Sequence, residues 1–232
     1  MKRSVVILII TNVILCIALL YVGYKSLQYK RLISENRKEY DCLRGWTNSL
    51  ESLHDTVDVV FFGNSITHGG RFDQAFPDMK VCNLGYPSDD LAGMRKRIPQ
   101  VVALHPLRVF IMGGTNNLSR YEHTSFELQY KELIIEIKKQ LPETSVFVQS
   151  ILPYNSNICK AKFKVDRKRA TIEANKVIEN IAVSEGLKYV DLYSLYVDSD
   201  GQMMQSLTSD GVHLKEEAYK IWYKEIKQYI YD

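Results

Sequence analysis

The sequence predicts a doubly wound α/β domain in which one parallel sheet is covered by helices on both faces. Short runs of β-branched and aromatic residues alternate with longer segments whose apolar residues recur at helical spacing. The short runs are continuously apolar, as expected for parallel strands that are buried on both sides. We therefore expect a three-layer α/β/α sandwich of the flavodoxin-like kind, with five parallel strands, over residues 57–232.

The alternation of strands and helices runs from residue 57 to the end of the chain. Strands are predicted over residues 57–62, 80–84, 108–112, 145–150 and 188–192. Helices are predicted over residues 91–104, 125–140, 167–185 and 215–230. In such sheets a ligand binds at the carboxyl ends of the strands, near the topological switch point. Loops that directly follow strands are therefore the candidate functional segments.

Length and composition indicate one globular domain with an additional segment. The chain has 232 residues, of which 46% are hydrophobic and 25% are charged. The net charge of +3 is small and evenly distributed, which argues against a nucleic-acid partner. Nothing in the sequence indicates an oligomeric state.

The additional segment, residues 1–24, is predicted to be an N-terminal membrane anchor. Lys2 and Arg3 precede an apolar run that only Thr11 and Asn12 interrupt. The run reaches the roughly 20 residues that a spanning helix needs. It lacks the small-residue cleavage site of a secretory signal peptide, which remains the alternative. We expect an uncleaved signal anchor that holds the following domain outside the cytoplasm, in the periplasm or at the cell surface.

Residues 25–56 are predicted to form a helical linker next to the membrane. They are rich in charge and contain no proline, and they carry leucines and Trp46 at roughly helical spacing. For the first half of this segment, an unstructured polar stalk is the alternative.

The stretch "VVFFGNSITHGG", Val59 to Gly70, is the first strand followed by a glycine-rich turn. It is not a P-loop, because His68 stands where the second glycine of G-x-x-x-x-G-K-[ST] belongs. It is not a G-x-S-x-G elbow either, because Thr67 replaces the last glycine. A metal site would need clustered Asp and His residues after several strands, and the sequence offers few. The remaining chemical interpretation is Ser65 as a nucleophile, which requires a base and an oxyanion hole.

Near the C-terminus, "LTSDGVHLKEEAYKIW" supplies a candidate base and an acid that orients it. Asp210 and His213 are three residues apart in a loop that opens a helix. This spacing lets Asp210 steady the imidazole while His213 accepts the serine proton. Helix capping is the alternative interpretation of such a pair.

Two further strand ends carry hydrogen-bond donors for an oxyanion. "NLGYPSDD" follows the second strand and contains Gly85, whose amide a ligand can approach closely because no Cβ intervenes. "IMGGTNNLS" follows the third strand and contains Asn116, whose amide offers two N–H donors. Turn formation alone would also explain either loop. The combination of three strand ends with the Asp-x-x-His loop favours a catalytic site.

These four blocks together resemble the SGNH (GDSL) hydrolase superfamily, over the whole region from residue 57 to the end of the chain. The blocks in question are Gly63-Asn64-Ser65, Asn83-Leu84-Gly85, Gly114-Thr115-Asn116-Asn117 and Asp210-Gly211-Val212-His213. The resemblance implies an SGNH hydrolase fold and an activity that needs no metal or organic cofactor.

The resemblance also implies a role for each matched residue. Ser65 would be the nucleophile, His213 the general base and then acid, and Asp210 the residue that orients it. The Ser65 amide, the Gly85 amide and the Asn116 side chain would form the oxyanion hole.

Two asparagines, Asn64 and Asn117, depart from the family pattern, which usually has aspartate at both positions. Neither replaces a residue that would do chemistry. The Gly-Thr-Asn-Asn block resembles the subgroup of platelet-activating-factor acetylhydrolases and carbohydrate acetylesterases, which favours acetyl esters. His68, Pro153 and Tyr154 are further candidates for lining the substrate pocket. The alternative for His68, which the sequence favours, is a surface histidine, and the alternative for Pro153 and Tyr154 is a plain Pro-Tyr turn.

Three functions remain open at this point. The first is a membrane-anchored esterase that acts on small-molecule or glycan esters, chiefly O-acetyl groups of a carbohydrate. The second is a lysophospholipase or thioesterase for longer acyl chains. The third is a catalytically silent domain that binds a glycan or a partner protein.

Overall fold

The computed structural model describes Tyr21, Tyr24, Lys25, Leu27 and residues 56–159 and 165–231. The chain divides into a unit of Met1–Leu53 and a unit of His54–Asp232. The predicted anchor (1–24) and linker (25–56) lie outside the described residues, apart from five positions. Among the residues that are described, no helix has the length and apolarity to cross a membrane.

The second unit is built on a five-stranded parallel sheet with the strand order β2-β1-β3-β4-β5. The strands are β1 (Val59–Gly63), β2 (Val81–Gly85), β3 (Arg108–Met112), β4 (Ser145–Gln149) and β5 (Lys188–Val190). This confirms the predicted α/β fold and all five predicted strands. β1 lies between β2 and β3, so the order reverses at β1 and its carboxyl end is the switch point of the sheet.

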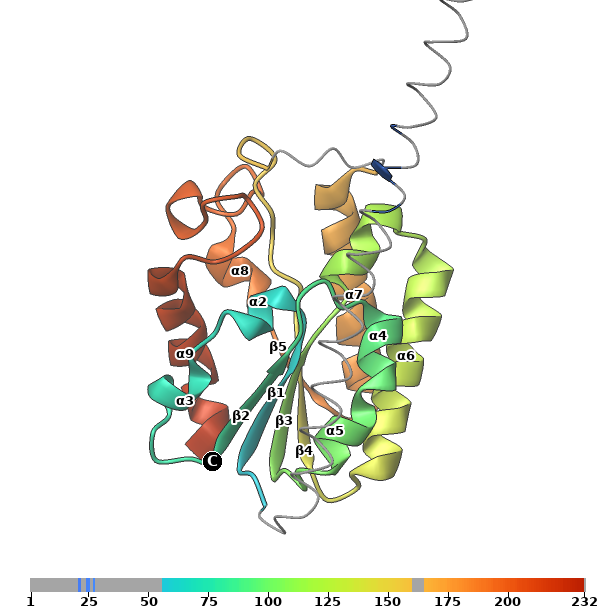
Figure 1. The fold of residues 1–232 in the computed structure, drawn as a ribbon, viewed down its shortest axis with the longest axis vertical. Helices are drawn as coiled ribbons and strands as arrows, with labels where there is room; N and C mark the ends of the chain where they lie inside the picture. The colour runs from blue at the N-terminus through green and yellow to red at the C-terminus, as the bar shows by residue number, and fades with distance from the viewer. Residues whose placement is uncertain (1–20, 22–23, 26, 28–55, 160–164, 232) are drawn as a thin grey trace, which may run out of the picture. The chain divides into compact units, whose positions relative to one another are not determined.

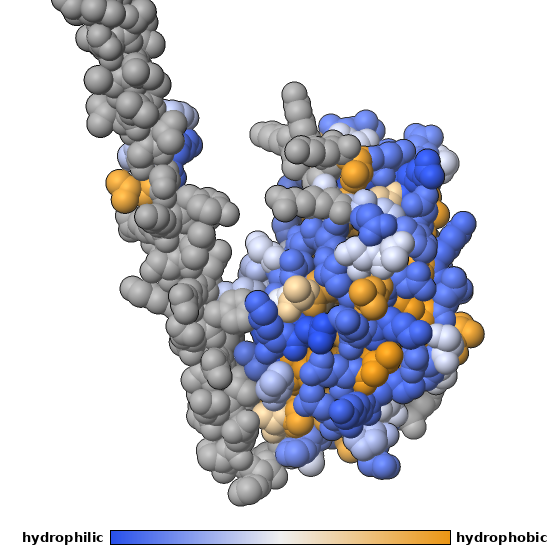
Figure 2. Space-filling model, turned by 90° about the vertical axis from the view of Figure 1, so that its right-hand side faces the viewer, coloured by the Kyte–Doolittle hydropathy of each residue, from blue (hydrophilic) through white to orange (hydrophobic). Residues whose placement is uncertain are grey.

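Helices cover both faces of this sheet (Figure 1). On one side lie α4 (Leu91–Lys96), α5 (Ile98–Val102), α6 (His123–Gln140) and α7 (Arg167–Ser184). On the other side lie α3 (Phe72–Ala75), α8 (Tyr193–Tyr196) and α9 (Glu216–Tyr231). The outer face that carries α6 is mainly hydrophilic, with hydrophobic residues at scattered positions (Figure 2). Leu128 and Ile135 of α6 are among the exposed hydrophobic residues.

Aromatic side chains form much of the core between the sheet and α9. Phe61 of β1 stacks on Phe72 with ring centroids 3.7 Å apart and on Phe110 at 5.1 Å. Trp222 of α9 is fully buried, meets Phe72 edge-on and donates its indole N–H to Gln149 Oε1 at 2.6 Å. Offset and edge-on ring contacts add to the area that such large side chains bury. This core fixes α9, and the loop before it, against β1.

The structure departs from the predicted helices in two ways. The single helix expected over 91–104 is two helices, α4 and α5, which meet at Arg97. Pro99 lies in the first turn of α5, where a residue without an N–H ends one helix and begins the next. Within the described ranges, three short α-helices were not predicted, namely α2 (Ser65–His68), α3 and α8, and neither were the 3-10 helices η1 (Thr115–Arg120) and η2 (Gln205–Leu207).

Candidate active site

Ser65, His213 and Asp210 form a continuous chain of hydrogen bonds at the carboxyl end of β1. Ser65 Oγ lies 2.9 Å from His213 Nε2, and His213 Nδ1 lies 2.7 Å from Asp210 Oδ2. Ser65 and His213 are 148 positions apart in the sequence. The geometry is that of a serine nucleophile, its base and an orienting carboxylate.

Ser65 is held in place by the turn that joins β1 to α2. The fully buried Asn64 is the N-cap of α2, and its Oδ1 accepts the N–H of Ile66 at 2.9 Å. Ser65 is therefore the first helical residue, and its own N–H has no acceptor within the helix. An asparagine at position 64 can accept this bond as well as the family's usual aspartate.

The loop of Asp210 and His213 is fixed by its own backbone. Asp210 Oδ1 accepts the N–H groups of Val212 at 2.9 Å and of His213 at 2.8 Å, which leaves Oδ2 for the imidazole. Gly211 adopts φ +83°, and its N–H donates to Thr208 Oγ1 at 2.9 Å. The tight turn brings the carboxylate within hydrogen-bond distance of Nδ1 of the histidine three residues later.

These hydrogen bonds keep Asp210 ionised. Partial burial alone would raise the pKa of its carboxyl, but hydrogen bonds from the His213 ring and from the amides of His213 and Val212 lower that pKa to about 2. The carboxylate can therefore stabilise a positive imidazolium whenever His213 takes up the serine proton.

Asn116 and Asn117 stand at the start of η1 (Thr115–Arg120), directly after β3. Asn116 Nδ2 donates to the carbonyl of Asp89 at 2.6 Å, which uses one of its two N–H groups. Asn117 Oδ1 accepts the N–H of Leu91, the first residue of α4, at 3.1 Å. The two side chains tie this turn to the loop that follows β2.

Gly85 is placed differently from its predicted role as an oxyanion donor. Its N–H donates to Asn83 Oδ1 at 2.9 Å. A Cβ at this position would lie 2.1 Å from the backbone nitrogen of His68 in α2. Gly85 therefore allows β2 to pack against α2, the helix that begins at Ser65. Because its N–H already donates to Asn83, the geometry does not support its predicted role as an oxyanion donor.

A different amide in the same loop is available as a donor. Ser88 is one of two non-glycine residues with positive φ among those described, at +64°. Its N–H has no hydrogen-bond partner within the described ranges, and it precedes the Asp89 carbonyl that Asn116 contacts. The sequence analysis missed Ser88 because serine rarely adopts this backbone conformation and carries no signal for it.

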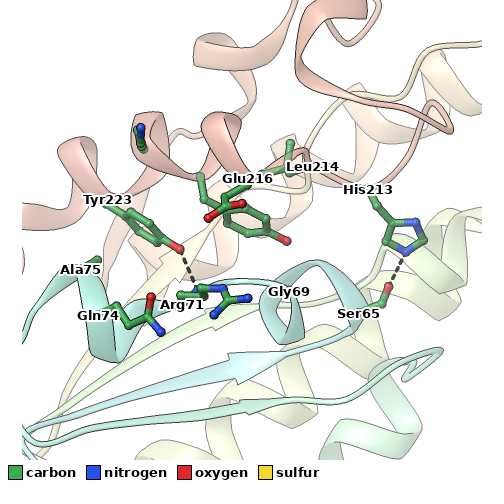
Figure 3. A pocket seen from close by; sticks show the side chains of 11 residues that line it. Ser65, Gly69, Arg71, Gln74, Ala75, His213, Leu214, Glu216 and Tyr223 are labelled. Carbon is green, nitrogen blue, oxygen red and sulfur yellow. Dashed lines mark hydrogen bonds between the residues drawn. The ribbon is translucent and has the colours of Figure 1, made fainter.

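A cavity of about 460 Å³ opens beside Ser65 and His213, between the segment after α2 and helix α9 (Figure 3). Arg71 and Gln74 line it from one side, and Glu216 and Tyr223 line it from α9. The hydroxyl of Tyr223 accepts the N–H of Arg71 at 2.7 Å, which joins the two walls. The cavity combines charged and amide groups with aromatic surface, and its volume is in the range of pockets that bind small molecules.

The three candidate pocket residues lie elsewhere. The His68 ring is hydrogen-bonded to the carbonyl of Gly85 at 3.1 Å and does not line this cavity. Pro153 is buried, and the ring of Tyr154 packs against the Arg167 guanidinium. None of the three contributes to the cavity beside Ser65. Within the described ranges, no three His, Cys, Asp or Glu residues group as metal ligands would.

Comparison with known proteins identifies the class that this fold and site define. The sequence profile of the GDSL-like lipase/acylhydrolase family matches residues 61–221. The chain belongs to this family, and it is a carboxylic ester hydrolase. This confirms the resemblance that the four sequence blocks indicated. None of the curated proteins matches the chain.

Solved structures show the same fold. A GDSL-like lipase from Bacteroides thetaiotaomicron has a TM-score of 0.70 and 24% identity, covering 81% of this chain and 96% of its own. A lipase/acylhydrolase from Enterococcus faecalis has a TM-score of 0.59 and 22% identity, covering 75% and 97%. An acetyl xylan esterase from Geobacillus stearothermophilus has a TM-score of 0.61 and 19% identity, covering 76% and 95%.

Proposed function

We propose that this protein is a serine esterase that removes short acyl groups, chiefly acetyl, from a carbohydrate through an acyl-enzyme. The observation that carries the proposal is the hydrogen-bonded chain Ser65–His213–Asp210, with distances of 2.9 and 2.7 Å. The 2.9 Å contact is within the range over which a base takes a proton from a nucleophile.

In the first half of the reaction, Ser65 Oγ attacks the ester carbonyl while its proton passes to His213 Nε2. Asp210 Oδ2 stabilises the imidazolium that forms. The tetrahedral intermediate collapses when His213 returns the proton to the leaving alcohol, which departs and leaves an acetyl group on Ser65. Water then gives a proton to His213 Nε2 and attacks the acyl carbon. His213 returns this proton to Ser65 Oγ as the bond between Oγ and the acyl carbon breaks, which releases acetate and restores the free serine.

The negative oxygen of the tetrahedral intermediate needs donors that are in place before the reaction. We assign this role to the Ser65 N–H at the start of α2, the second N–H of the Asn116 amide, and the Ser88 N–H. Ser88 takes the place of the Gly85 amide, which is committed to Asn83.

The character of the cavity supports a polar alcohol portion rather than a long acyl chain. Arg71, Gln74, Glu216 and Lys220 all line the cavity beside Ser65, and a long acyl chain bound there would cover these charged and amide groups without offering them hydrogen bonds. Sugar hydroxyls can hydrogen-bond to such groups, and the rings of Tyr219 and Tyr223 offer flat surface for a sugar ring. An acetyl xylan esterase is among the proteins of similar fold, which agrees with this substrate class.

We further propose that residues 1–24 anchor the enzyme in a membrane and that the catalytic domain acts outside the cytoplasm. The support is the apolar run of about 20 residues between Lys2-Arg3 and the charged linker. This location suits an enzyme whose substrate is an extracellular or cell-wall carbohydrate.

The test is hydrolysis of p-nitrophenyl esters from acetate to palmitate, and of an acetylated xylo-oligosaccharide, by wild type and Ser65→Ala. We expect activity that is highest on acetate, released acetate from the oligosaccharide, and neither in Ser65→Ala. A preference for palmitate would contradict the acetyl proposal. A folded wild type without activity on any ester would contradict the esterase itself.

A further inference from the structure

We propose that Arg97, through its buried ion pair with Asp89, positions the Asn116 amide as an oxyanion donor. Arg97 is a positioning residue, because its side chain contacts the loop behind the site and not Ser65. The inference rests on the proposed role of Asn116 in the reaction.

The first observation is a charged pair that is almost completely removed from solvent. Arg97 is 2% exposed and Asp89 is 5% exposed. Arg97 Nε and Nη2 donate to the same Asp89 oxygen, Oδ2, at 2.8 and 2.6 Å. A buried ion pair adds little net stability compared with an apolar pair of the same shape, so stability alone does not explain its presence.

The second observation is that Arg97 binds the ends of the two strands that carry the site. Its Nη1 donates to the carbonyl of Leu84 at 3.0 Å, and its Nη2 donates to the carbonyl of Gly63 at 3.1 Å. Leu84 is the penultimate residue of β2, and Gly63 is the last residue of β1, two positions before the nucleophile. The guanidinium carbon also lies 4.9 Å from the centre of the Phe62 ring and 5.5 Å from that of Tyr86.

The third observation connects this pair to the proposed oxyanion hole. The backbone carbonyl of Asp89 accepts the hydrogen bond from Asn116 Nδ2 at 2.6 Å. A carbonyl can only accept, so this contact fixes which end of the Asn116 amide faces the loop and leaves the second N–H for substrate. Asp89 is thus held by its side chain to Arg97 and holds Asn116 by its main chain.

The fork of the guanidinium makes this arrangement specific to arginine. It makes four hydrogen bonds to three partners, two to Asp89 Oδ2 and one each to the carbonyls of Leu84 and Gly63, and only a planar group with several N–H donors makes them together. A lysine keeps the charge and can bind Asp89, but it cannot hold both strand ends as well. Arg97→Lys is therefore expected to loosen the loop without leaving Asp89 unpaired.

A double-mutant cycle on the full chain tests the inference. With p-nitrophenyl acetate, Arg97→Lys is expected to lower kcat about tenfold or more while KM stays within about threefold, because a donor acting mainly in the transition state is misplaced. In the Asn116→Ala background the same change is expected to alter kcat by less than about twofold, because the donor it positions is gone. Lys138→Met, which breaks the ion pair between Lys138 in the last turn of α6 and Glu185 at the end of α7, is the control and should leave kcat unchanged.

The outcomes separate this inference from the proposed function. Multiplicative losses in the double variant, or wild-type kcat in Arg97→Lys, would overturn the role of Arg97. A wild-type kcat in Asn116→Ala would instead overturn the oxyanion assignment on which it rests. Should Arg97→Lys not fold, the cycle is run with Asp89→Asn, which preserves the shape of the pair and removes one charge. An effect on kcat that disappears in the Asn116→Ala background would again support the inference, and multiplicative losses would overturn it.

Discussion

Substituting Gly85 by alanine distinguishes a role as a hydrogen-bond donor from a role in the close packing of β2 against α2. Alanine keeps the backbone N–H, so a role limited to hydrogen bonding would survive the change. The added methyl group, however, would lie 2.1 Å from His68 N, 2.6 Å from His68 Cα and 2.6 Å from the carbonyl carbon of Thr67. All three atoms belong to the backbone of α2, the helix that begins at Ser65.

The size of the expected effect follows from these distances. Ordinary van der Waals contact begins at 3.4 Å, so α2 and β2 must separate by about 1.3 Å, the difference between 3.4 and 2.1 Å. A misplacement of about 1 Å at a catalytic group costs about 10²-fold in rate. We therefore expect kcat of Gly85→Ala to fall about 10²-fold, with a loss of roughly 1–3 kcal/mol in the free energy of unfolding from overpacking.

The assay is steady-state hydrolysis of p-nitrophenyl acetate together with thermal denaturation. Gly186→Ala is the control, because no atom lies within 4 Å of the Cβ added there, so the change strains the backbone at φ +68° without creating a clash. It should lose about 1–2 kcal/mol of stability and retain full kcat. A Gly85→Ala enzyme with wild-type kcat would refute the packing interpretation of Gly85.

Three further predictions concern the site itself. Asn116→Ala should lower kcat on p-nitrophenyl acetate about 10²–10³-fold, while Asn180→Ala on the exposed face of α7 should not; equal activities would show that Asn116 donates nothing in the transition state. Asp210→Asn should lower kcat about 10³–10⁴-fold. Because Oδ1 accepts two backbone amides, the new NH₂ group would face His213 Nδ1, which would then have to accept a hydrogen bond. The ring proton would move to Nε2, which could no longer accept the proton of Ser65. A loss below tenfold would contradict that assignment. The pKa of Asp210 is lowered to about 2, so its charge should stabilise the fold fully above pH ~4 and lose this effect as the pH falls towards 2. The difference in thermal midpoint between wild type and Asp210→Asn should thus shrink as the pH falls from ~4 towards 2; a difference that is unchanged across this interval would contradict the assignment.

The centre of the sheet was predictable from the sequence because β1 and β3 are buried on both faces. Residues 59–62 and 109–112 are continuous apolar runs, and their parallel pairing follows from the helices between them. The short helices were not predictable in this way. α2 has only four residues, about one turn, which is too short for apolar residues to recur at helical spacing. It forms because Asn64 caps it and β2 packs against it.

The break between α4 and α5 was missed for a related reason. The buried residues Leu91 and Met94 of α4 and Ile98 and Val101 of α5 are three or four positions apart, so the sequence pattern looks like that of one continuous helix. The chain nevertheless turns at Arg97, whose side chain enters the interior to reach Asp89 and the strand ends. A buried arginine in an amphipathic pattern looks like a surface residue until its partners are known.

The site residues also differ in how far the sequence predicts them. Ser65, Asp210 and His213 were predictable because their side chains carry the chemistry and their motifs are local. Backbone donors have no such signal. Whether the N–H of Gly85 or of Ser88 is available depends on the orientation of the Asn83 side chain and on one positive φ, which residue types do not determine.

The proposed mechanism requires an acetyl group to pass through Ser65, and this can be observed directly. The enzyme is mixed with p-nitrophenyl acetate, quenched with acid within the first turnovers, digested and analysed by peptide mass spectrometry. We predict one acetyl group, on Ser65, which disappears on longer incubation once substrate is consumed. Full turnover with no acetylated Ser65 at any time, or with the same turnover in Ser65→Ala, would contradict the mechanism.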